Sequence, residues 1–192
     1  MHEVHIHDGI VLNRRGVREA DLLVDLLTPM GLVRALARSA RAEKSKLRYG
    51  LQPLTCGRYS FVRGRHEWRL TGVTDVSRQY LSMSSEAQAA AARVARLLLR
   101  LVAGQEPSPE LFSTASEGFD ALAKTATVPN AVPAIEAVVV LRILSCLGYL
   151  PHVEALAPFV EGEFSLELSA KALEARGLLI KTINESLRAS GL

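Results

Sequence analysis

"READLLVDLLTPMGLVRALARS", residues 18–39, is the stretch that decides the fold class. Its apolar residues recur at every second position, at Ala20, Leu22, Val24 and Leu26 and again at Val33, Ala35 and Ala37. A period of two is typical of a β-strand with one buried face. Between the two runs, "TPMG" (28–31) joins a proline, which fixes one φ angle, to a glycine that accepts a positive φ. The stretch therefore predicts two strands, 18–27 and 32–39, connected by a tight turn.

Strand patterns continue on both sides of this pair. "VHIHDGIVLNR" (4–14) places Val4, Ile6, Ile10 and Leu12 on one parity, and Asp8-Gly9 interrupts it as a β-bulge would. "LTCGRYSFVRG" (54–64) and "HEWRLTGVTDV" (66–76) predict a hairpin that turns at Gly64-Arg65. Five short strands, with one helical connector between the third and the fourth, predict a small Greek-key barrel of the OB type.

The apolar period changes from two to about 3.6 near Ser84. "SSEAQAAAARVARLLLRLVAGQ" (84–105) opens with a serine cap and ends at Gly104, and further helices are expected over 108–126, 132–149 and, as one or two segments, 169–190. The helix over 132–149 has almost no polar face, which places it in the middle of a bundle. The sequence thus predicts an α+β protein with an OB-fold nucleic-acid-binding domain at 1–80 and an all-α helical domain at 81–192.

Composition excludes several classes of protein. The 192 residues are 48% hydrophobic and 22% charged, which supports a real core rather than disorder. No stretch approaches the roughly 20 apolar residues of a membrane span, and "MHEVHIHDG" has no signal-peptide pattern. Cys56 and Cys146 are too few for a disulfide framework. We expect a cytoplasmic protein, associated with the nucleoid if it binds DNA.

Catalytic chemistry has little support in the sequence. No phosphate-binding, dinucleotide-binding, zinc-protease or serine-hydrolase motif occurs. His5 and His7 on one strand face are a possible pair of metal ligands, but the remaining histidines have no partner at a recognisable spacing. We expect no catalytic residue, no metal and no cofactor, and the metal-dependent hydrolase stays an alternative that needs bound metal.

Charge is unevenly distributed along the chain. Residues 1–80 hold 14 Lys and Arg against 8 Asp and Glu, whereas residues 81–192 hold 9 against 12. The basic residues concentrate in "RSARAEKSKLRYGLQPLT" (38–55), which is either a solvated loop or a surface for a polyanion. The candidate residues for such a polyanion-binding surface are Arg14, Arg15, Arg18, Arg34, Arg38, Arg41, Lys44, Lys46, Arg48 and Tyr49.

Aromatic and helical residues supply weaker candidates. Tyr59, Phe61 and Trp68 suit either base stacking or the barrel core, with core packing favoured for Phe61 and Trp68. A second, partner-binding site is a possible role for arginines that flank apolar helical residues, or these arginines form a solvated stripe and a core-edge group. They are Arg93, Arg96, Arg100 and Arg142.

The N-terminal residues resemble the RecO family of bacterial recombination mediators. The resemblance rests on "GIVL" (9–12), "EAD" (19–21), "TPMG" (28–31), the Ala-Arg repeat at 35–41, "SK" (45–46) and "LQP" (51–53), in that order and at those spacings. Further on, "LRILSCLGYLP" (141–151) is similar to the family's bundle helix and its Leu-Gly-Tyr-x-Pro turn. The resemblance covers residues 4–80 well and 132–192 loosely.

The resemblance implies an OB-fold followed by a helical domain. It also implies binding of single- and double-stranded DNA, annealing of complementary strands, contact with RecR and with the C-terminal tail of single-stranded-DNA-binding protein, and help in loading RecA. Many family members carry a four-cysteine zinc insertion after the position of Pro151, but "HVEALAPFVEGEFSLELS" has no cysteine, so zinc is not implied. An OB-fold RNA or tRNA adaptor and a pure protein-interaction scaffold remain alternatives.

Overall fold

The protein is described by a computed structural model that covers residues 3–65, 67–102, 106–125, 131–151, 153–189 and 191. The chain forms two compact units. The first unit comprises Met1–Leu81 with Ala95–Phe112, and the second comprises Ser82–Val94 with Ser113–Leu192.

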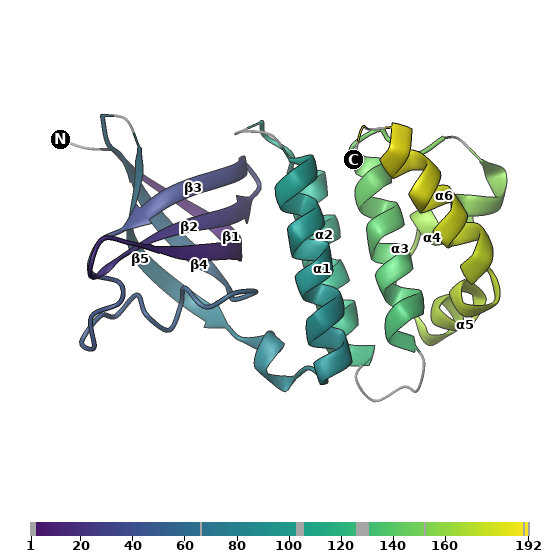
Figure 1. The fold of residues 1–192 in the computed structure, drawn as a ribbon, viewed down its shortest axis with the longest axis horizontal. Coiled ribbons are helices and arrows are strands. Elements are labelled where there is room, and N and C mark those ends of the chain that lie inside the picture. Colours follow the sequence, from purple (N-terminus) through teal and green to yellow (C-terminus); the bar gives the residue numbers. More distant parts are fainter. Residues whose placement is uncertain are drawn as a thin grey trace. The chain divides into compact units, whose positions relative to one another are not determined.

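Five strands of the first unit close into a barrel (Figure 1). They are β1 (Val4–Val17), β2 (Asp21–Thr28), β3 (Gly31–Ala37), β4 (Cys56–Arg63) and β5 (Trp68–Ser77). Their order around the barrel is β1-β2-β3-β5-β4. Only β3 and β5 pair in parallel, and the other neighbours are antiparallel. The five-stranded OB-type barrel that the sequence predicts is confirmed, and it is closed through the short pairing of Ala35 and Leu36 with Trp68 and Arg69.

In β2 and β3 the barrel core follows the alternation that the sequence displays, whereas at the start of β1 the apolar parity is not the buried one, since Val4 and Ile6 are exposed. Val24, Val33 and Ala35 are buried on the inner face, and Arg34 between the last two is exposed. Tyr59 and Phe61 fill the interior, with 0% and 2% of their surfaces exposed. Burial raises the pKa of the Tyr59 phenol well above its usual value, because the phenolate would lose its hydration.

The turn between β2 and β3 takes the form expected of "TPMG". Gly31 has a φ of +94°, and a Cβ added there would lie 2.5 Å from the carbonyl oxygen of Glu106. The Thr28 hydroxyl donates to the Gly31 carbonyl at 2.9 Å and accepts from the Met30 amide at 3.2 Å. Glycine is required here both by backbone angle and by space.

The bulge predicted at Asp8-Gly9 is wrong. β1 pairs with β4 without interruption from Val4 to Ile10, and the irregularity falls between Val11 and Asn13, where β1 pairs with β2. A bulge bends a strand, and this one lies just after the point where the pairing of β1 changes from β4 to β2. Gly9 is needed for packing instead, because a Cβ there would lie 3.0 Å from the Tyr59 ring.

The helical connector predicted between the third and fourth strands is also wrong. Residues 38–55, all described by the structure, form only turns and bends. Like charges such as Arg41 and Lys44, three positions apart, repel each other on a helix, and Gly50 and Pro53 disfavour its continuation. Short turns replace the helix.

Helices make up most of the remaining described residues. They are the one-turn η1 (Gln79–Ser82), α1 (Ser85–Leu101), α2 (Pro109–Lys124), α3 (Ala131–Cys146), the short η3 (Glu154–Leu156) and α4 (Ala157–Val160), α5 (Leu166–Glu174) and α6 (Arg176–Ala189). A serine caps α1, as the sequence predicts: the hydroxyl of Ser84 accepts from the Ala87 amide at 3.2 Å. The predicted end at Gly104 lies outside the described residues.

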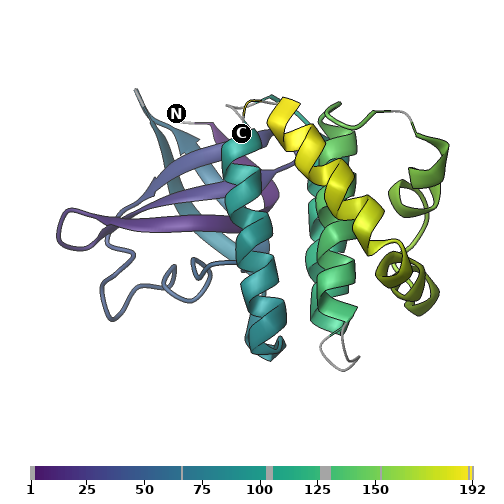
Figure 2. The same ribbon diagram turned by 45° about the vertical axis from the view of Figure 1, so that its right-hand side comes forward.

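The apolar helix α3 has the central position that its composition predicts. It contacts α4, α5 and α6, and it shares a buried cluster with Phe159, Leu168 and Leu179 (Figures 1 and 2). Beyond its C-terminal end, Gly148 has a φ of +74°, and the Tyr149 amide donates to the Leu144 carbonyl at 2.9 Å. No helix among the described residues is long and apolar enough to cross a membrane.

Candidate nucleic-acid interface

The basic stretch forms a run of tight turns, which we call the basic loop (residues 38–55). Amides donate to the carbonyl three residues earlier, from Ala42 to Ser39, from Ser45 to Ala42 and from Arg48 to Ser45, at 3.1, 3.0 and 3.3 Å. Ser39 and Leu54, near the two ends of the loop, have left-handed φ angles of 51° and 58°. The loop therefore has a defined backbone path in spite of lacking a helix.

Apolar side chains fix the basic loop to the barrel. Ala40 and Leu51 are fully buried in the barrel core, and Leu47 packs against the same cluster. The Tyr59 hydroxyl lies 2.9 Å from the Gly50 carbonyl oxygen, to which it donates. At the far end, the Leu54 amide donates to the Val11 carbonyl at 2.7 Å. With its apolar residues inside, the loop presents its cations to solvent.

Exposure and charge pairing single out the cations of the loop. All five are exposed: Arg38, Arg41, Lys44, Lys46 and Arg48. Among the described residues none of these five side chains forms an ion pair with a carboxylate. Their charge is therefore available to an anion from solution.

The first hairpin lies beside the loop through Arg41. The Arg41 amide donates to the Ala20 carbonyl at 2.9 Å, and its guanidinium lies 3.2 Å from where a Gly16 Cβ would be. Alternate residues of a strand point to opposite faces, so Arg14 shares the Gly16 face and Arg15 lies on the other. Arg18, at the tip, forms a long ion pair of 3.9 Å with Asp21. The hairpin thus adds mainly Arg14 to the face that Arg41 occupies.

Arg34 differs from the loop cations because a carboxylate holds it. Its Nε donates to Asp25 Oδ1 at 2.6 Å, and the Asn13 amide donates to the other carboxylate oxygen at 3.1 Å. Asp25 is only 5% exposed and pairs directly with Arg34 in the register of β2 and β3. The sequence interpretation missed this acid, although an aspartate inside the apolar run "LLVDLL" is itself the signal.

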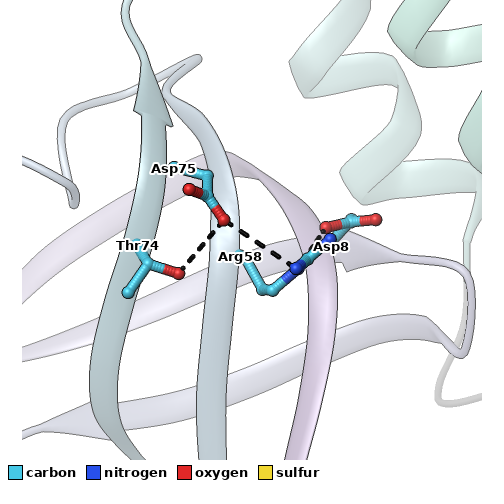
Figure 3. Close-up of polar contacts among 4 residues, drawn as sticks. All are labelled: Asp8, Arg58, Thr74 and Asp75. Atoms are coloured by element: carbon cyan, nitrogen blue, oxygen red, sulfur yellow. Dashed lines mark hydrogen bonds and ion pairs between the residues drawn. The ribbon is translucent and has the colours of Figure 1, made fainter.

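Another part of the barrel surface carries an arginine between two carboxylates (Figure 3). Arg58 of β4 lies 3.3 Å from Asp8 of β1 and 3.9 Å from Asp75 of β5. Thr74 donates to Asp75 at 3.4 Å. We call Asp8, Arg58 and Asp75 the acidic triplet, since it has one more negative than positive charge. It offers a phosphate no net attraction.

The aromatic residues divide between core and surface. Tyr59 and Phe61 are buried, which confirms core packing for Phe61. Trp68 is half-buried at the start of β5. Tyr49 is 63% exposed, and the Arg78 guanidinium lies 5.9 Å from its ring centroid. Tyr49 is the loop's one aromatic side chain, and it has the exposure that stacking requires.

The helical arginines have unequal surroundings. Arg93 makes two hydrogen bonds of 2.6 Å to Glu136, and this carboxylate raises the arginine pKa. Arg142 is 6% exposed, its Nε donates to the Phe159 carbonyl at 2.9 Å, and burial lowers its pKa. Arg96 and Arg100 are exposed and form no ion pair among the described residues.

The two histidines considered as metal ligands lie on the inner face of β1. His5 pairs with Phe61 and His7 with Tyr59 in the register of β1 and β4. In the described part of the chain, no group of three His, Cys, Asp or Glu side chains is placed to hold a metal ion. His66 and His152 lie outside the described residues.

Comparisons with known proteins agree with the resemblance in sequence. The family model "Recombination protein O N terminal" matches residues 1–77, and "Recombination protein O C terminal" matches residues 84–157. The chain is 30% identical to the DNA repair protein RecO of Pseudomonas putida strain W619 over 164 residues, 83% of this chain and 69% of that protein.

Two further relatives bear the same name. That of Pseudomonas entomophila strain L48 is 32% identical over 72% of this chain and 58% of its own length. That of Roseiflexus sp. strain RS-1 is 31% identical over 78% of this chain and 52% of its own length. The chain thus spans between about half and two thirds of the length of these relatives. With both halves matched in order on a five-stranded barrel followed by helices, the chain belongs to the RecO family.

Proposed function

We propose that this protein is a non-enzymatic DNA-binding mediator of recombinational repair, whose basic loop holds the phosphates of single-stranded DNA. The observation that carries the proposal is the set of five exposed loop cations without carboxylate partners among the described residues. Its relatives are named DNA repair proteins, which supports DNA rather than RNA as the polyanion.

Strand annealing follows from phosphate contacts that leave bases free. Each cation that neutralises a phosphate releases a condensed counterion, which favours binding at low salt. Such contacts position a strand without reading its bases. Because the basic loop supplies cations and a single exposed aromatic residue, Tyr49, it screens the charge of two strands while their base edges remain able to pair.

Recombinase loading and the partners RecR and single-stranded-DNA-binding protein belong to the same proposal. An acidic, apolar tail needs cations beside apolar helix residues. Arg96 and Arg100 of α1 are exposed, with Leu97 half-buried between them. We assign the contact with the tail to these two arginines, while Arg93 and Arg142 support the helices through Glu136 and the Phe159 carbonyl.

The test is fluorescence-anisotropy binding to an unstructured single-stranded oligonucleotide at several salt concentrations. The variant Arg38→Ala/Lys44→Ala/Lys46→Ala removes three loop cations. Arg176→Ala/Lys181→Ala/Arg188→Ala, on α6, removes the same charge elsewhere and serves as the matched control.

The loss of three phosphate contacts should make the negative slope of log K against log salt shallower by about two, at roughly 0.7 per contact. Binding should be about 100-fold weaker near 0.1 M salt. The control should keep the wild-type slope. Equal losses in both variants would mean that net charge, not the basic loop, governs binding. No binding at low salt would leave a protein-interaction scaffold as the better account.

A further inference from the structure

Two cavities meet at Trp68, at one end of the barrel. The first, of about 230 Å³, is lined by residues that include His5, His7, Phe61 and Trp68. The second, of about 460 Å³, is lined by Arg34, Arg63, Arg65, Glu67 and Trp68 among others. Trp68 and Arg63 line both cavities, so they form a shared wall between an aromatic space and a cationic one.

The first cavity exists because the barrel interior is incompletely filled at this end. In the strand register His5 is opposite Phe61, and Trp68 is opposite the small Ala35. These residues share the inner parity, and deeper in the barrel Tyr59 and Leu70 fill the same face. A space of 230 Å³ holds several waters at about 30 Å³ each, and thus has room for one planar ring.

In the described part of the chain, the ring geometry leaves the indole without a stacked aromatic neighbour. The His5 and Trp68 rings meet edge to face, with centroids 5.1 Å apart and planes at 87°. The Phe61 and Trp68 rings do the same at 6.4 Å and 73°. The Arg63 guanidinium lies 5.1 Å from the indole centroid, where its charge is attracted by the ring face. Among the described residues no aromatic ring lies parallel to Trp68.

Three arginines, Arg34, Arg63 and Arg65, line the second cavity together with the same indole. Arg63 and Arg65 belong to the β4–β5 hairpin, which is closed by a 2.9 Å hydrogen bond from the Gly64 amide to the Glu67 carbonyl. A Cβ at Gly64 would lie 2.8 Å from that carbonyl oxygen, so only glycine fits the turn. Within the described residues Arg63 and Arg65 form no ion pair, whereas Arg34 is held by Asp25. With these two arginines, unpaired in the part of the chain that the structure describes, against the single carboxylate of Glu67, the lining keeps a net positive charge, which suits the cavity to an anion.

We propose that this end of the barrel binds one unpaired nucleotide: its base enters the aromatic cavity against Trp68, and its phosphate lies on Arg63 and Arg65. The inference rests on the DNA-binding function proposed above, and it adds a base-binding site outside the basic loop. A base in a duplex is stacked and paired and cannot enter the cavity. The site therefore confers a preference for single strands that phosphate contacts alone do not give.

Trp68 is itself the probe, because the chain has a single tryptophan. Wild-type protein is titrated with a dye-free oligothymidylate while Trp68 emission is recorded, and binding is followed in parallel by anisotropy of a labelled copy. An oligonucleotide of equal length with abasic positions carries the phosphates without the bases, and a blunt hairpin duplex carries bases that are paired. Stacking predicts that only the oligothymidylate quenches Trp68.

Variants separate the base from the phosphate. Trp68→Leu should weaken single-strand binding about tenfold and leave duplex binding unchanged, as expected for the loss of one base–aromatic contact. Arg65→Gln should reduce the salt slope by about 0.7 and keep a quench at saturation, while Arg188→Gln on α6, its matched control, should change neither. The quenching experiment needs no variant and so does not depend on the folding of Trp68→Leu.

The outcomes distinguish this inference from the proposed function. Anisotropy that reports binding while Trp68 emission stays constant overturns the base site and leaves DNA binding intact. The same quench with the abasic strand or the duplex also overturns it, because no free base is then required. If no DNA gives an anisotropy change, the proposed function fails and the base site with it.

Discussion

The basic loop and the acidic triplet both place exposed arginines on one barrel, but the loop arginines have no carboxylate partner among the described residues while Arg58 has two. Arg58 has 55% of its side chain exposed, so exposure alone does not separate it from Arg41 or Arg48. The difference is in the local pairing of charge. A phosphate gains attraction only where the protein has not already neutralised the cation.

The loop differs from the triplet in a second respect, which is how its side chains are held. Arg58 sits on a strand within a regular register with β1 and β5. The loop cations have only turns beneath them, and the order of those turns comes from Leu51 and Tyr59 in the core. Removing these anchors should therefore abolish the order of the loop that the comparison rests on. Such substitutions give the largest expected effects on the free energy of unfolding.

Leu51→Ala should have the largest effect on stability. Leu51 is fully buried, and truncation of a buried leucine costs about 2–5 kcal/mol through lost transfer energy and the cavity left behind. Urea unfolding measures the free energy of unfolding, with Leu173→Ala as the control because Leu173 of α5 is 46% exposed. Similar unfolding free energies for both variants would show that the loop is not anchored through Leu51.

Gly50→Ala should have the next largest effect. A Cβ at Gly50 would lie 2.5 Å from Cγ1 of Val73, so the loop must move or the barrel must deform, at a cost of about 1–3 kcal/mol. Adding Val73→Ala should recover part of the loss, because it removes the atom in conflict. A double-mutant cycle from urea unfolding checks this coupling, and strictly additive effects would contradict it.

Tyr59→Phe should have a smaller effect that depends on pH. At neutral pH it removes a donor from the Gly50 carbonyl and should cost about 1–2 kcal/mol. The raised pKa of Tyr59 in the folded state means that only the unfolded chain ionises there above about pH 10, so wild-type stability falls as pH rises past that point. The Tyr59→Phe variant lacks this pH dependence, so the difference in unfolding free energy between the two proteins should narrow at high pH. Unfolding at pH 7.5 and 10.5 measures it, and a constant gap would count against the buried phenol.

Much of the barrel could be predicted from the sequence because alternation is a local property. Val33, Ala35 and Ala37 identify the inner face of β3, and the "TPMG" turn follows from proline and glycine alone. The bulge was misplaced because Gly9 is explained by the Tyr59 ring, fifty positions further along the chain, and not by its neighbours. The missing helix in the basic loop has a similar cause, since tertiary anchors replace helical hydrogen bonds.

The candidate site was less predictable than the fold. The content of cations marks residues 38–55. The sequence does not show that Arg34 forms an ion pair with Asp25, or that Arg58 pairs with Asp8 and Asp75. These pairs depend on strand register, which brings residues 9, 50 and 17 positions apart into contact. For the same reason the cavity beside Trp68 could not be found, because its walls come from β1, β3, β4 and β5.

The most direct test of the account compares two single substitutions, Arg48→Gln in the basic loop and Arg58→Gln in the acidic triplet. Each removes one exposed barrel arginine, and the salt dependence of single-stranded DNA binding is measured for both by anisotropy. The account predicts that the slope of log K against log salt becomes shallower by about 0.7 for Arg48→Gln and stays unchanged for Arg58→Gln. Equal changes in the two slopes would contradict it, because unpaired and paired arginines would then serve DNA alike.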